Sequence, residues 1–455
     1  MPRLSSNKTK YLMINFILLK IYRLRKDIKM NQEIKELFSM LQKSVSPYHV
    51  VEEGTAQLER AGYHEKKLDK KWDLKKGEGY FIRPYGSTLI AFRIGEQYQS
   101  NDMLRIEAAH TDWPCLKLKS LPEKKGHYQS LNVEVYGGPI LNTWLDRPLS
   151  AAGRVALKGT DIFHPTIRLI DFKKPCFIIP NLAIHMNRKM NDGVELNRQV
   201  DMLPLCGINE SSEKNWFLTA LAKELQVDPS DIIDYEINVY NKDSCDFVGF
   251  HEDFISSPRL DNISSVYACL TGLLHGQRKD GINLIALFDN EEIGSHTKQG
   301  GDSNILPMVL EHLYTALGQN REDYLTAIAG GMMLSVDVAH AIHPNHPEKC
   351  DITNQIYLNE GVAIKLSGNQ RYATDCEAVS IVEQLCKKHN IPYKKFANRS
   401  DIPGGSTLGT ITSSFLPMKT VDLGVPILAM HSSRETMGAN DQSSLCHLLK
   451  AFFEE

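Results

Sequence analysis

The chain has 455 residues, of which 24% are charged and 42% hydrophobic, and its formal net charge is −3. This length allows two or three domains around a large core, and the balanced charge gives no electrostatic basis for binding nucleic acid or an anionic membrane. Nine cysteines stand singly, without a Cys-x-x-Cys pair. This pattern favours reduced thiols in a cytoplasmic protein over disulfides or a cysteine-zinc site.

The first thirty residues differ in character from the rest of the chain. Residues 11–24 are apolar but contain two basic residues, so this run is too short and too charged to span a bilayer. No small-residue cleavage site typical of a signal peptide follows it. A helix that Asn31 can cap begins next, and residues 1–29 are therefore expected to be a dispensable extension.

The elements expected before residue 114 are a helix, a hairpin and a strand. The run 50–61, which follows Pro47 and is closed by Gly62, predicts a short helix. Two β-rich runs on either side of a Pro-Tyr-Gly-Ser turn predict a hairpin over residues 80–94. The apolar run 103–109 predicts a strand that delivers a histidine and an aspartate at its end.

Residues 115–250 have a different pattern. Short β-rich pieces are separated by breakers, and a helical pattern resumes only at residues 216–225. Strands without long intervening helices predict an antiparallel or barrel-like unit. We expect this unit to be a β-rich oligomerisation domain, inserted into a catalytic domain formed by residues 30–114 and 251–455.

From about residue 255 onward, strands and helices alternate, which is typical of a mostly parallel sheet with helices on both faces. Strands are expected over residues 282–288, 332–338 and 425–430. Helices are expected over residues 262–274, 305–317, 376–389 and 443–453. The predicted fold class is therefore α/β, with a mostly parallel central sheet flanked by helices and an inserted β-rich domain.

Two adjacent carboxylates, Glu291 and Glu292, follow the apolar run 282–288. Neighbouring residues on an extended segment point in opposite directions, so one glutamate can bind a metal ion while the other handles a proton. Taken alone, the pair is more often a solvated acidic turn. Other residues that can bind metal stand at similar positions, and their number favours a metal site over a solvated turn.

Such residues occur at four further places. His110 and Asp112 follow the strand expected to end at residue 109, and Asp261 precedes the helix expected from residue 262. Asp337 lies within the strand expected over residues 332–338, and His431 follows the strand expected over residues 425–430. Each has a structural alternative, as a hydrogen-bonded core histidine, a helix N-cap or a turn cap. The carboxyl ends of strands in an open α/β sheet line one crevice, so together these residues favour a single site. Two histidines and three carboxylates suit two divalent cations that share a carboxylate, with zinc first and cobalt or manganese as alternatives. Such ligands indicate hydrolysis but not the substrate.

The chain resembles the aspartyl aminopeptidase family of dinuclear zinc exopeptidases over residues 30–455. The resemblance rests on ordered sequence blocks. These are AHTD (109–112), DRPL (146–149), IPNLAIH (179–185), PRLDN (258–262), DNEEIGS (289–295), SVDVAHA (335–341), QRYATD (370–375) and MHSSRE (430–435).

The resemblance implies a complete set of site residues. The implied metal ligands, with the aspartate at 261 bridging two ions, are His110, Asp261, Glu292, Asp337 and His431. Glu291 would act as general base and acid, and Asp112 would orient the ring of His110, a role that metal chemistry expects independently. In the family, the residue matching His343 lies near the oxyanion and the one matching Lys365 lies in the substrate pocket. The histidine matching His185 reaches a neighbouring subunit's active site, within a tetrahedral dodecamer.

The predicted function is that of a metalloaminopeptidase, which hydrolyses the N-terminal residue of a peptide with a metal-activated water and Glu291 as base. Lys365 lies in an apolar run that predicts a strand, where its ammonium would favour Asp or Glu. A preference for neutral or apolar residues is the alternative, and a solvated surface lysine is the structural alternative. Trp113 replaces the small residue usual beside the metal site and is expected to narrow or reshape the pocket.

Two other classes of function compete with this prediction. A dinuclear phosphoesterase would need a cluster of cationic residues near the ligands, which the sequence lacks. A non-catalytic oligomeric binding shell would keep the fold without the chemistry. The complete ligand set and Glu291 disfavour this second class.

Overall fold

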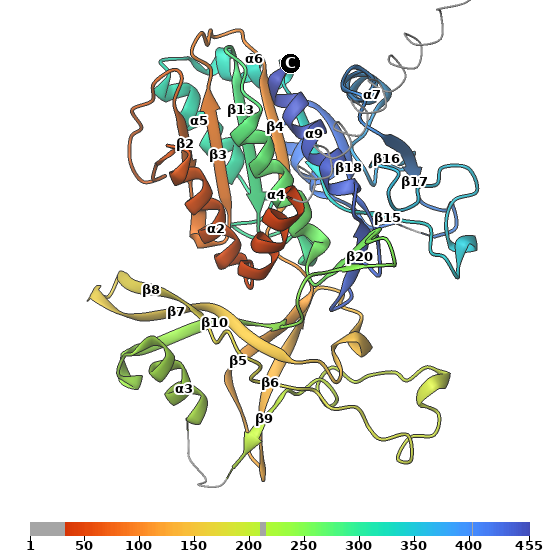
Figure 1. Cartoon of the computed structure of the whole chain (residues 1–455). Helices are drawn as coiled ribbons and strands as arrows, with labels where there is room; N and C mark the ends of the chain where they lie inside the picture. Colours follow the sequence, from red (N-terminus) through yellow and green to blue (C-terminus); the bar gives the residue numbers. More distant parts are fainter. Residues whose placement is uncertain (1–31, 210–214, 403) are drawn as a thin grey trace, which may run out of the picture.

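The computed structural model describes residues 32–209, 215–402 and 404–455 (Figure 1). The expected extension of residues 1–29 and the cap at Asn31 lie outside these ranges. The helix expected after Asn31 is present over residues 32–43. It is followed by α2 (Pro47–Arg60), whose N-cap Ser46 accepts a hydrogen bond from the His49 backbone N–H.

The main sheet of the described chain has nine strands, in the order β1-β2-β3-β13-β4-β14-β18-β16-β17. At its centre β13, β4, β14 and β18 run parallel, whereas β2, β3 and β16 make antiparallel pairs on the flanks. The sheet is thus mixed, and of its eight strand pairs in the described chain five are parallel and three antiparallel. The strands are β1 (His64–Glu65), β2 (Gly79–Ile82), β3 (Leu89–Ile94), β4 (Leu104–His110), β13 (Ile282–Phe288), β14 (Met332–Val336), β16 (Val362–Leu366), β17 (Tyr393–Ala397) and β18 (Lys419–Gly424).

Helices cover both faces of this sheet, which explains why its central strands read as continuous apolar runs. In β13, Leu284 and Phe288 point into one core, while Ile285 and Leu287 point into the other. The first core includes residues of α5 (Ile305–Ala316), α6 (Arg321–Gly330) and α8 (Leu408–Phe415). The second core includes residues of α2, α4 (Leu260–His275), α7 (Cys376–His389) and α9 (Asp441–Glu454).

A second, six-stranded sheet is antiparallel throughout and has the order β8-β7-β10-β5-β6-β9 (Figure 1). Helix α3 (Trp216–Leu225) packs against it through Phe217 and Leu221. Its strands are β5 (Cys115–Lys124), β6 (Tyr128–Tyr136), β7 (Leu149–Asp161), β8 (His164–Asp171), β9 (Leu205–Ile208) and β10 (Ile232–Asn241). The β-rich pattern of the sequence is therefore an antiparallel sheet, while the domain boundaries at residues 114 and 251 stay predictions.

A third sheet has the order β11-β12-β20-β19-β15. Its strands are β11 (Asp246–Val248), β12 (Phe254–Ser257), β15 (Ala339–His340), β19 (Pro426–Leu428) and β20 (Glu435–Gly438). Because β12 leads into α4 and β19 precedes His431, this sheet brings Asp261 and His431 to one place.

Several expected strands end differently in the structure. The run expected over residues 332–338 ends at Val336, so Asp337 lies after the strand rather than within it. The run expected over residues 425–430 shortens to β19. Strand β18 was not expected, because Thr420 and Asp422 interrupt its apolar pattern; both are nevertheless buried.

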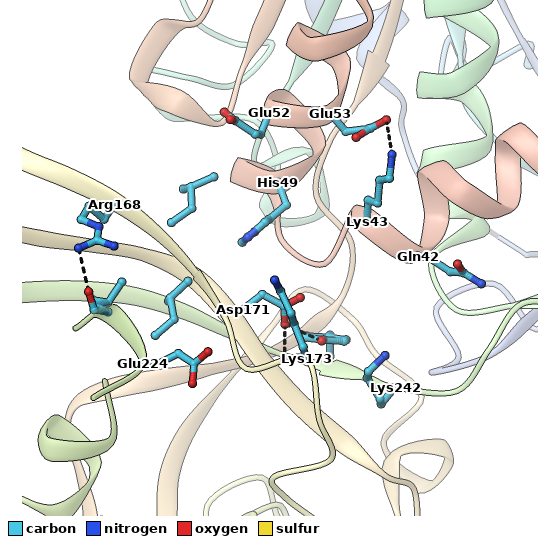
Figure 2. A pocket seen from close by; sticks show the side chains of 14 residues that line it. Gln42, Lys43, His49, Glu52, Glu53, Arg168, Asp171, Lys173, Glu224 and Lys242 are labelled. Atoms are coloured by element: carbon cyan, nitrogen blue, oxygen red, sulfur yellow. Dashed lines mark hydrogen bonds and ion pairs between the residues drawn. The ribbon is translucent and has the colours of Figure 1, made fainter. Parts of the chain in front are cut away.

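Where α2 meets the six-stranded sheet there is a pocket of about 560 Å³, which we call the junction pocket (Figure 2). Charged side chains of α2 and of the six-stranded sheet line it, including Glu53 of α2 and Asp171 of β8. Among the described residues, no helix combines the length and the apolar character needed to cross a membrane.

Candidate metal centre

The predicted ligands come from five separate places in the chain and surround one pocket of about 390 Å³, which we call the metal pocket. His110 ends β4, and the parallel register pairs it with Phe288, the last residue of β13. The short 3-10 turn Glu291–Ile293 follows β13 and carries Glu292. Asp337 follows β14 and lies near the same edge because Ser335 pairs with Ala108. Sheet topology therefore gathers these side chains at the carboxyl ends of parallel strands.

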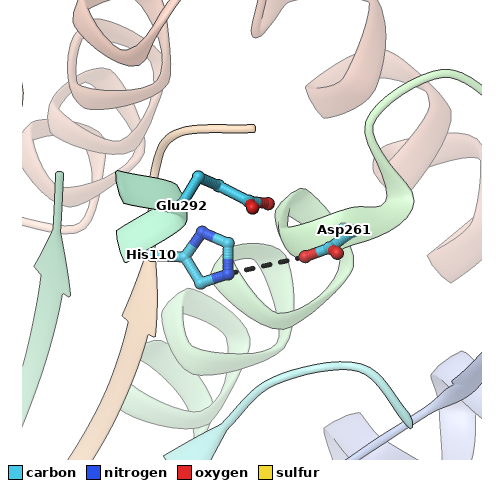
Figure 3. A group of neighbouring side chains, drawn as sticks. All are labelled: His110, Asp261 and Glu292. Carbon is cyan, nitrogen blue, oxygen red and sulfur yellow. Dashed lines mark ion pairs between the residues drawn. The ribbon is translucent and has the colours of Figure 1, made fainter. Parts of the chain in front are cut away.

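Asp261 lies between the two histidines. Its Oδ1 is 3.4 Å from His110 Nε2, and its Oδ2 is 3.5 Å from His431 Nε2. Figure 3 shows the Asp261 carboxylate facing the His110 ring, with the Glu292 side chain above that ring and its carboxylate extending towards the Asp261 side. Each oxygen of this one carboxylate thus faces a different imidazole.

The two remaining carboxylates divide between the histidines. Asp337 Oδ1 is 3.6 Å from His110 Nε2, and Glu292 Oε2 is 3.3 Å from His431 Nε2. One ligand atom from each of His110, Asp261 and Glu292 lies within 4.8 Å of the others. The predicted ligands therefore form two overlapping groups of side chains, and Asp261 belongs to both.

Bound metal ions explain the arrangement of these side chains better than hydrogen bonds among the side chains do. Asp261 Oδ1 and Glu292 Oε1 are buried and have no hydrogen-bond partner among the described residues. Two ligands about 2.1 Å from a tetrahedrally coordinated zinc ion are about 3.4 Å apart, close to the separations above. The donor set contains imidazole nitrogen and carboxylate oxygen without sulfur, which suits zinc, cobalt or manganese.

Burial and mutual repulsion shift the pKa values of the site. Burial first, and then the neighbouring carboxylates Asp337 and Asp112, raise the pKa of Glu291 to about 8, against the opposing effect of His110. Burial and Asp261 likewise raise the pKa of Glu292 well above its ordinary value. Burial alone would lower the pKa of His110, but its carboxylate neighbours outweigh that effect and raise it. Such a gathering of buried carboxylates favours cations at this place, because cations would stabilise the charged carboxylates.

Asp112 holds the glutamate turn against β4. Its Oδ1 accepts a hydrogen bond from the Glu291 backbone N–H at 3.1 Å and lies 3.4 Å from His110 Nδ1. Its Oδ2 accepts from the Glu292 backbone N–H at 3.2 Å. The predicted contact between Asp112 and the His110 ring is therefore present in the structure.

Glu435, which the sequence analysis did not single out, has a similar position on the opposite side of the centre. Its carboxylate accepts hydrogen bonds from the backbone N–H groups of Asp261, at 2.9 Å, and of His431, at 2.8 Å. One buried side chain thus fixes the backbone of two predicted ligands. The MHSSRE block contains Glu435, but nothing in its spacing indicated this contact.

Lys365 lines the metal pocket, and its buried ammonium lies 3.3 Å from Asp337 Oδ2. His340 also lines it. The structure does not bring the other two predicted histidines there. His343 is exposed and lines an adjacent pocket, to which His340 also contributes. His185 is exposed on the segment between β8 and β9.

Trp113 does not narrow the metal pocket, so that expectation is wrong. The indole is buried and lines a separate, much smaller cavity on the far side of Asp261 and His431. The Arg259 guanidinium lies 5.5 Å from its ring centre. The side chain is therefore not among those that line the metal pocket.

An α/β sheet that presents histidines and carboxylates at its strand ends is typical of metal-dependent hydrolases. Comparison with known proteins identifies the family. The sequence pattern described as "Aminopeptidase I zinc metalloprotease (M18)" matches residues 40–453. The chain therefore belongs to the M18 family, which confirms the resemblance given above, and it is a zinc-dependent aminopeptidase.

Similar proteins cover almost the whole chain. A "Probable M18 family aminopeptidase 2" of Clostridium novyi (strain NT) is 45% identical over 422 residues, which are 92% of this chain and 98% of the relative. A chain of the cryo-EM structure of the Ape4 and Nbr1 complex matches with a TM-score of 0.90 and 31% identity, covering 94% of this chain and 86% of that one. The structure of the S. cerevesiae mApe1 dodecamer matches with a TM-score of 0.82 and 25% identity, covering 93% and 97%.

Proposed function

We propose that this aminopeptidase removes N-terminal Asp or Glu residues from peptides and uses two metal ions that share Asp261. The observation that carries the proposal is the position of that carboxylate, whose two oxygens face His110 and His431 at nearly equal distances. Asp337 would complete the site on the His110 side, and Glu292 the site on the His431 side. Zinc is the expected metal, because the family is one of zinc metalloproteases.

Bound ions would supply Lewis-acid chemistry, polarising the scissile carbonyl and lowering the pKa of the attacking water. The protein's own contribution is proton transfer by Glu291, which lines the metal pocket beside the ligands. Its carboxylate takes a proton from the water and returns it to the leaving amine. The hydrogen bond from its backbone N–H to Asp112 holds Glu291 in place during both transfers.

The proposed preference for acidic residues rests on Lys365. Among the described residues that line the metal pocket, it is the one lysine or arginine. Its ammonium is buried between Asp337 and the Tyr372 ring, 5.5 Å from the ring centre. A buried ammonium at the edge of a pocket attracts a carboxylate side chain more strongly than a neutral one.

The role proposed for His343 at the oxyanion requires a movement. His343 lies in the adjacent pocket, and the backbone that carries it is an exposed segment after β15. That segment would have to shift towards the metal pocket when a peptide binds. His340, which already lines the metal pocket, is an alternative donor that would need no such movement.

We further propose a homo-oligomer, with a tetrahedral dodecamer as the expected form, because a matching solved structure is a dodecamer. Residues 115–250 would be the inserted domain that makes the contacts between subunits. This assembly would give the exposed His185 its predicted place at a neighbouring subunit's active site. The nine cysteines are free in the structure, which supports the proposed cytoplasmic location.

The test is hydrolysis of a panel of aminoacyl substrates by zinc-loaded protein. The panel sets Asp and Glu against Leu, Ala and Lys, with an N-acetylated aspartyl substrate and a phosphodiester as controls. Release of Asp or Glu without cleavage of either control supports the proposal. Faster release of Leu would overturn the acidic preference, and cleavage of the phosphodiester alone would overturn peptide hydrolysis.

A further inference from the structure

The six-stranded sheet contributes one side chain to the support of the metal centre. Tyr136 is the last residue of β6, and antiparallel pairing places it opposite Cys115, the first residue of β5. Asp112 precedes β5 by only three positions. Strand pairing within this sheet therefore brings the Tyr136 hydroxyl to the carboxylate beside His110.

The hydroxyl group of Tyr136 is held from two sides. It donates a hydrogen bond to Asp112 Oδ2 at 2.6 Å and accepts one from Asn290 Nδ2 at 2.9 Å. The ring is buried, and the Lys117 ammonium lies 3.9 Å from its centre. A short bond from a fixed hydroxyl to a buried carboxylate is among the stronger hydrogen bonds in a protein.

This bond completes the environment of Asp112. The carboxylate accepts hydrogen bonds from two backbone N–H groups, at Glu291 and Glu292, and contacts the His110 ring. A carboxylate offers about four acceptor positions, so Tyr136 takes the remaining one. Without the hydroxyl, the Asp112 carboxylate loses one of these partners, so it holds the glutamate turn and its position beside the His110 ring less firmly. The Asp112 carbonyl oxygen, 3.1 Å from His110 Nδ1, remains as a second contact to that ring.

We infer that Tyr136 is a positioning residue for the metal centre, acting through Asp112, and that the six-stranded sheet is thereby a structural part of the zinc site. The inference rests on the proposed function insofar as His110 and Glu292 bind metal. Outer partners of metal ligands typically contribute about 10- to 100-fold in metal affinity or activity. Tyr136 occupies such a position although it belongs to another sheet.

The experiment compares Tyr136→Phe with a matched control, Tyr240→Phe. Tyr240 lies in the same sheet, and its hydroxyl donates a 2.7 Å hydrogen bond to Asp171, which lines the junction pocket (Figure 2). Both substitutions remove one tyrosine–aspartate bond and keep the ring. Zinc affinity is measured by competition with a chromophoric chelator, and the environment of the metal by the visible absorption bands of the cobalt(II)-loaded proteins.

We expect Tyr136→Phe to bind zinc about 10- to 100-fold more weakly and to shift the cobalt bands, while Tyr240→Phe matches the wild type in both. In an Asp112→Asn background, Tyr136→Phe should have little further effect, because the two residues act as one unit. Wild-type affinity and spectrum in Tyr136→Phe would overturn the inference. So would a Tyr136→Phe protein that does not fold with zinc present, since the hydroxyl would then be a requirement for folding. Failure of the wild type itself to bind zinc would instead overturn the proposed function.

Discussion

The metal pocket and the junction pocket both gather charged side chains, but they satisfy those charges in different ways. In the junction pocket, Lys43 pairs with Glu53 at 3.1 Å, and Asp171 accepts hydrogen bonds from Tyr240 and from a backbone N–H (Figure 2). In the metal pocket, oxygens of Asp261 and Glu292 are buried without a hydrogen-bond partner among the described residues. The junction pocket is the larger of the two, at about 560 Å³ against about 390 Å³.

The size of a cavity therefore does not identify the candidate site in this molecule. Buried carboxylates without a partner cost free energy, and their gathering around one pocket, rather than singly as at Glu107, favours a ligand there. Paired charges at the surface of a groove need no such explanation. Each of the following predictions tests whether the two pockets really differ in this way.

The largest effect is expected from Glu291→Gln. The amide keeps the shape of the side chain but cannot take a proton from water, so turnover should fall about 10²- to 10⁴-fold. Zinc content should remain that of the wild type, because Glu291 is not among the ligands proposed above. Steady-state kinetics and metal analysis of the same sample check both points. A metal-loaded Glu291→Gln protein with wild-type turnover would show that another group is the base.

The second prediction concerns pH and metal removal. In the metal-free protein the pKa of Glu291 is raised to about 8, whereas an unfolded glutamate titrates near 4.5. Between pH 4.5 and about pH 8, Glu291 therefore keeps its proton in the folded state but has lost it in the unfolded state. Stability should therefore fall as pH rises through this window, by up to about 1.4 kcal/mol per pH unit for one such carboxylate. The raised pKa of His110 acts in the same direction.

Thermal unfolding between pH 5 and pH 8, with chelator and with zinc, measures this dependence. Zinc should remove most of it, because a bound cation stabilises the charged carboxylates. Glu291→Gln, which has no proton to lose, is the matched control and should show a smaller fall with chelator present. Chelated wild-type protein that gains stability towards pH 8 would contradict the assignment of unpaired carboxylates to this pocket.

The third prediction concerns substrate preference. Lys365→Met removes the ammonium and keeps a long side chain, so the ratio of kcat/KM for Asp over Ala substrates should fall about 10- to 100-fold, as a lost charge-assisted hydrogen bond of 1.5–3 kcal/mol implies. Lys365 also contacts Asp337, so zinc content must be measured in parallel. An unchanged ratio in a zinc-loaded variant would place the specificity elsewhere in the pocket.

Much of the fold and of this candidate site could be predicted because the apolar runs stop at or near the predicted ligands. The strands β4 and β13 end at His110 and just before Glu291, as their sequence pattern indicates. The meeting of Asp261 with His431 could not be predicted in this way. It depends on the pairing of β12 with β20, which joins segments about 180 residues apart.

Side chains that act through long-range contacts are the hardest to recognise from the sequence pattern. Tyr136 looks like the end of an ordinary β-rich run until the pairing of β5 with β6 places it beside Asp112. His343 shows the opposite case, because the family resemblance implies a role near the oxyanion but the structure puts it in the adjacent pocket. Sequence motifs report chemistry at fixed spacing, whereas these positions depend on how distant segments pack.

The smallest effect is expected from Glu53→Gln in the junction pocket. This change removes the ion pair with Lys43, whose side chain is 55% exposed. Exposed ion pairs contribute about 0.2–1 kcal/mol, so the free energy of unfolding should fall by less than about 1 kcal/mol. Zinc affinity and turnover should match the wild type, because no buried polar atom is left without a partner near the ligands. Denaturant unfolding and kinetics of the same variant measure both quantities. A large loss of activity would mean that the junction pocket also has a functional ligand, and the contrast between the two pockets would then fail.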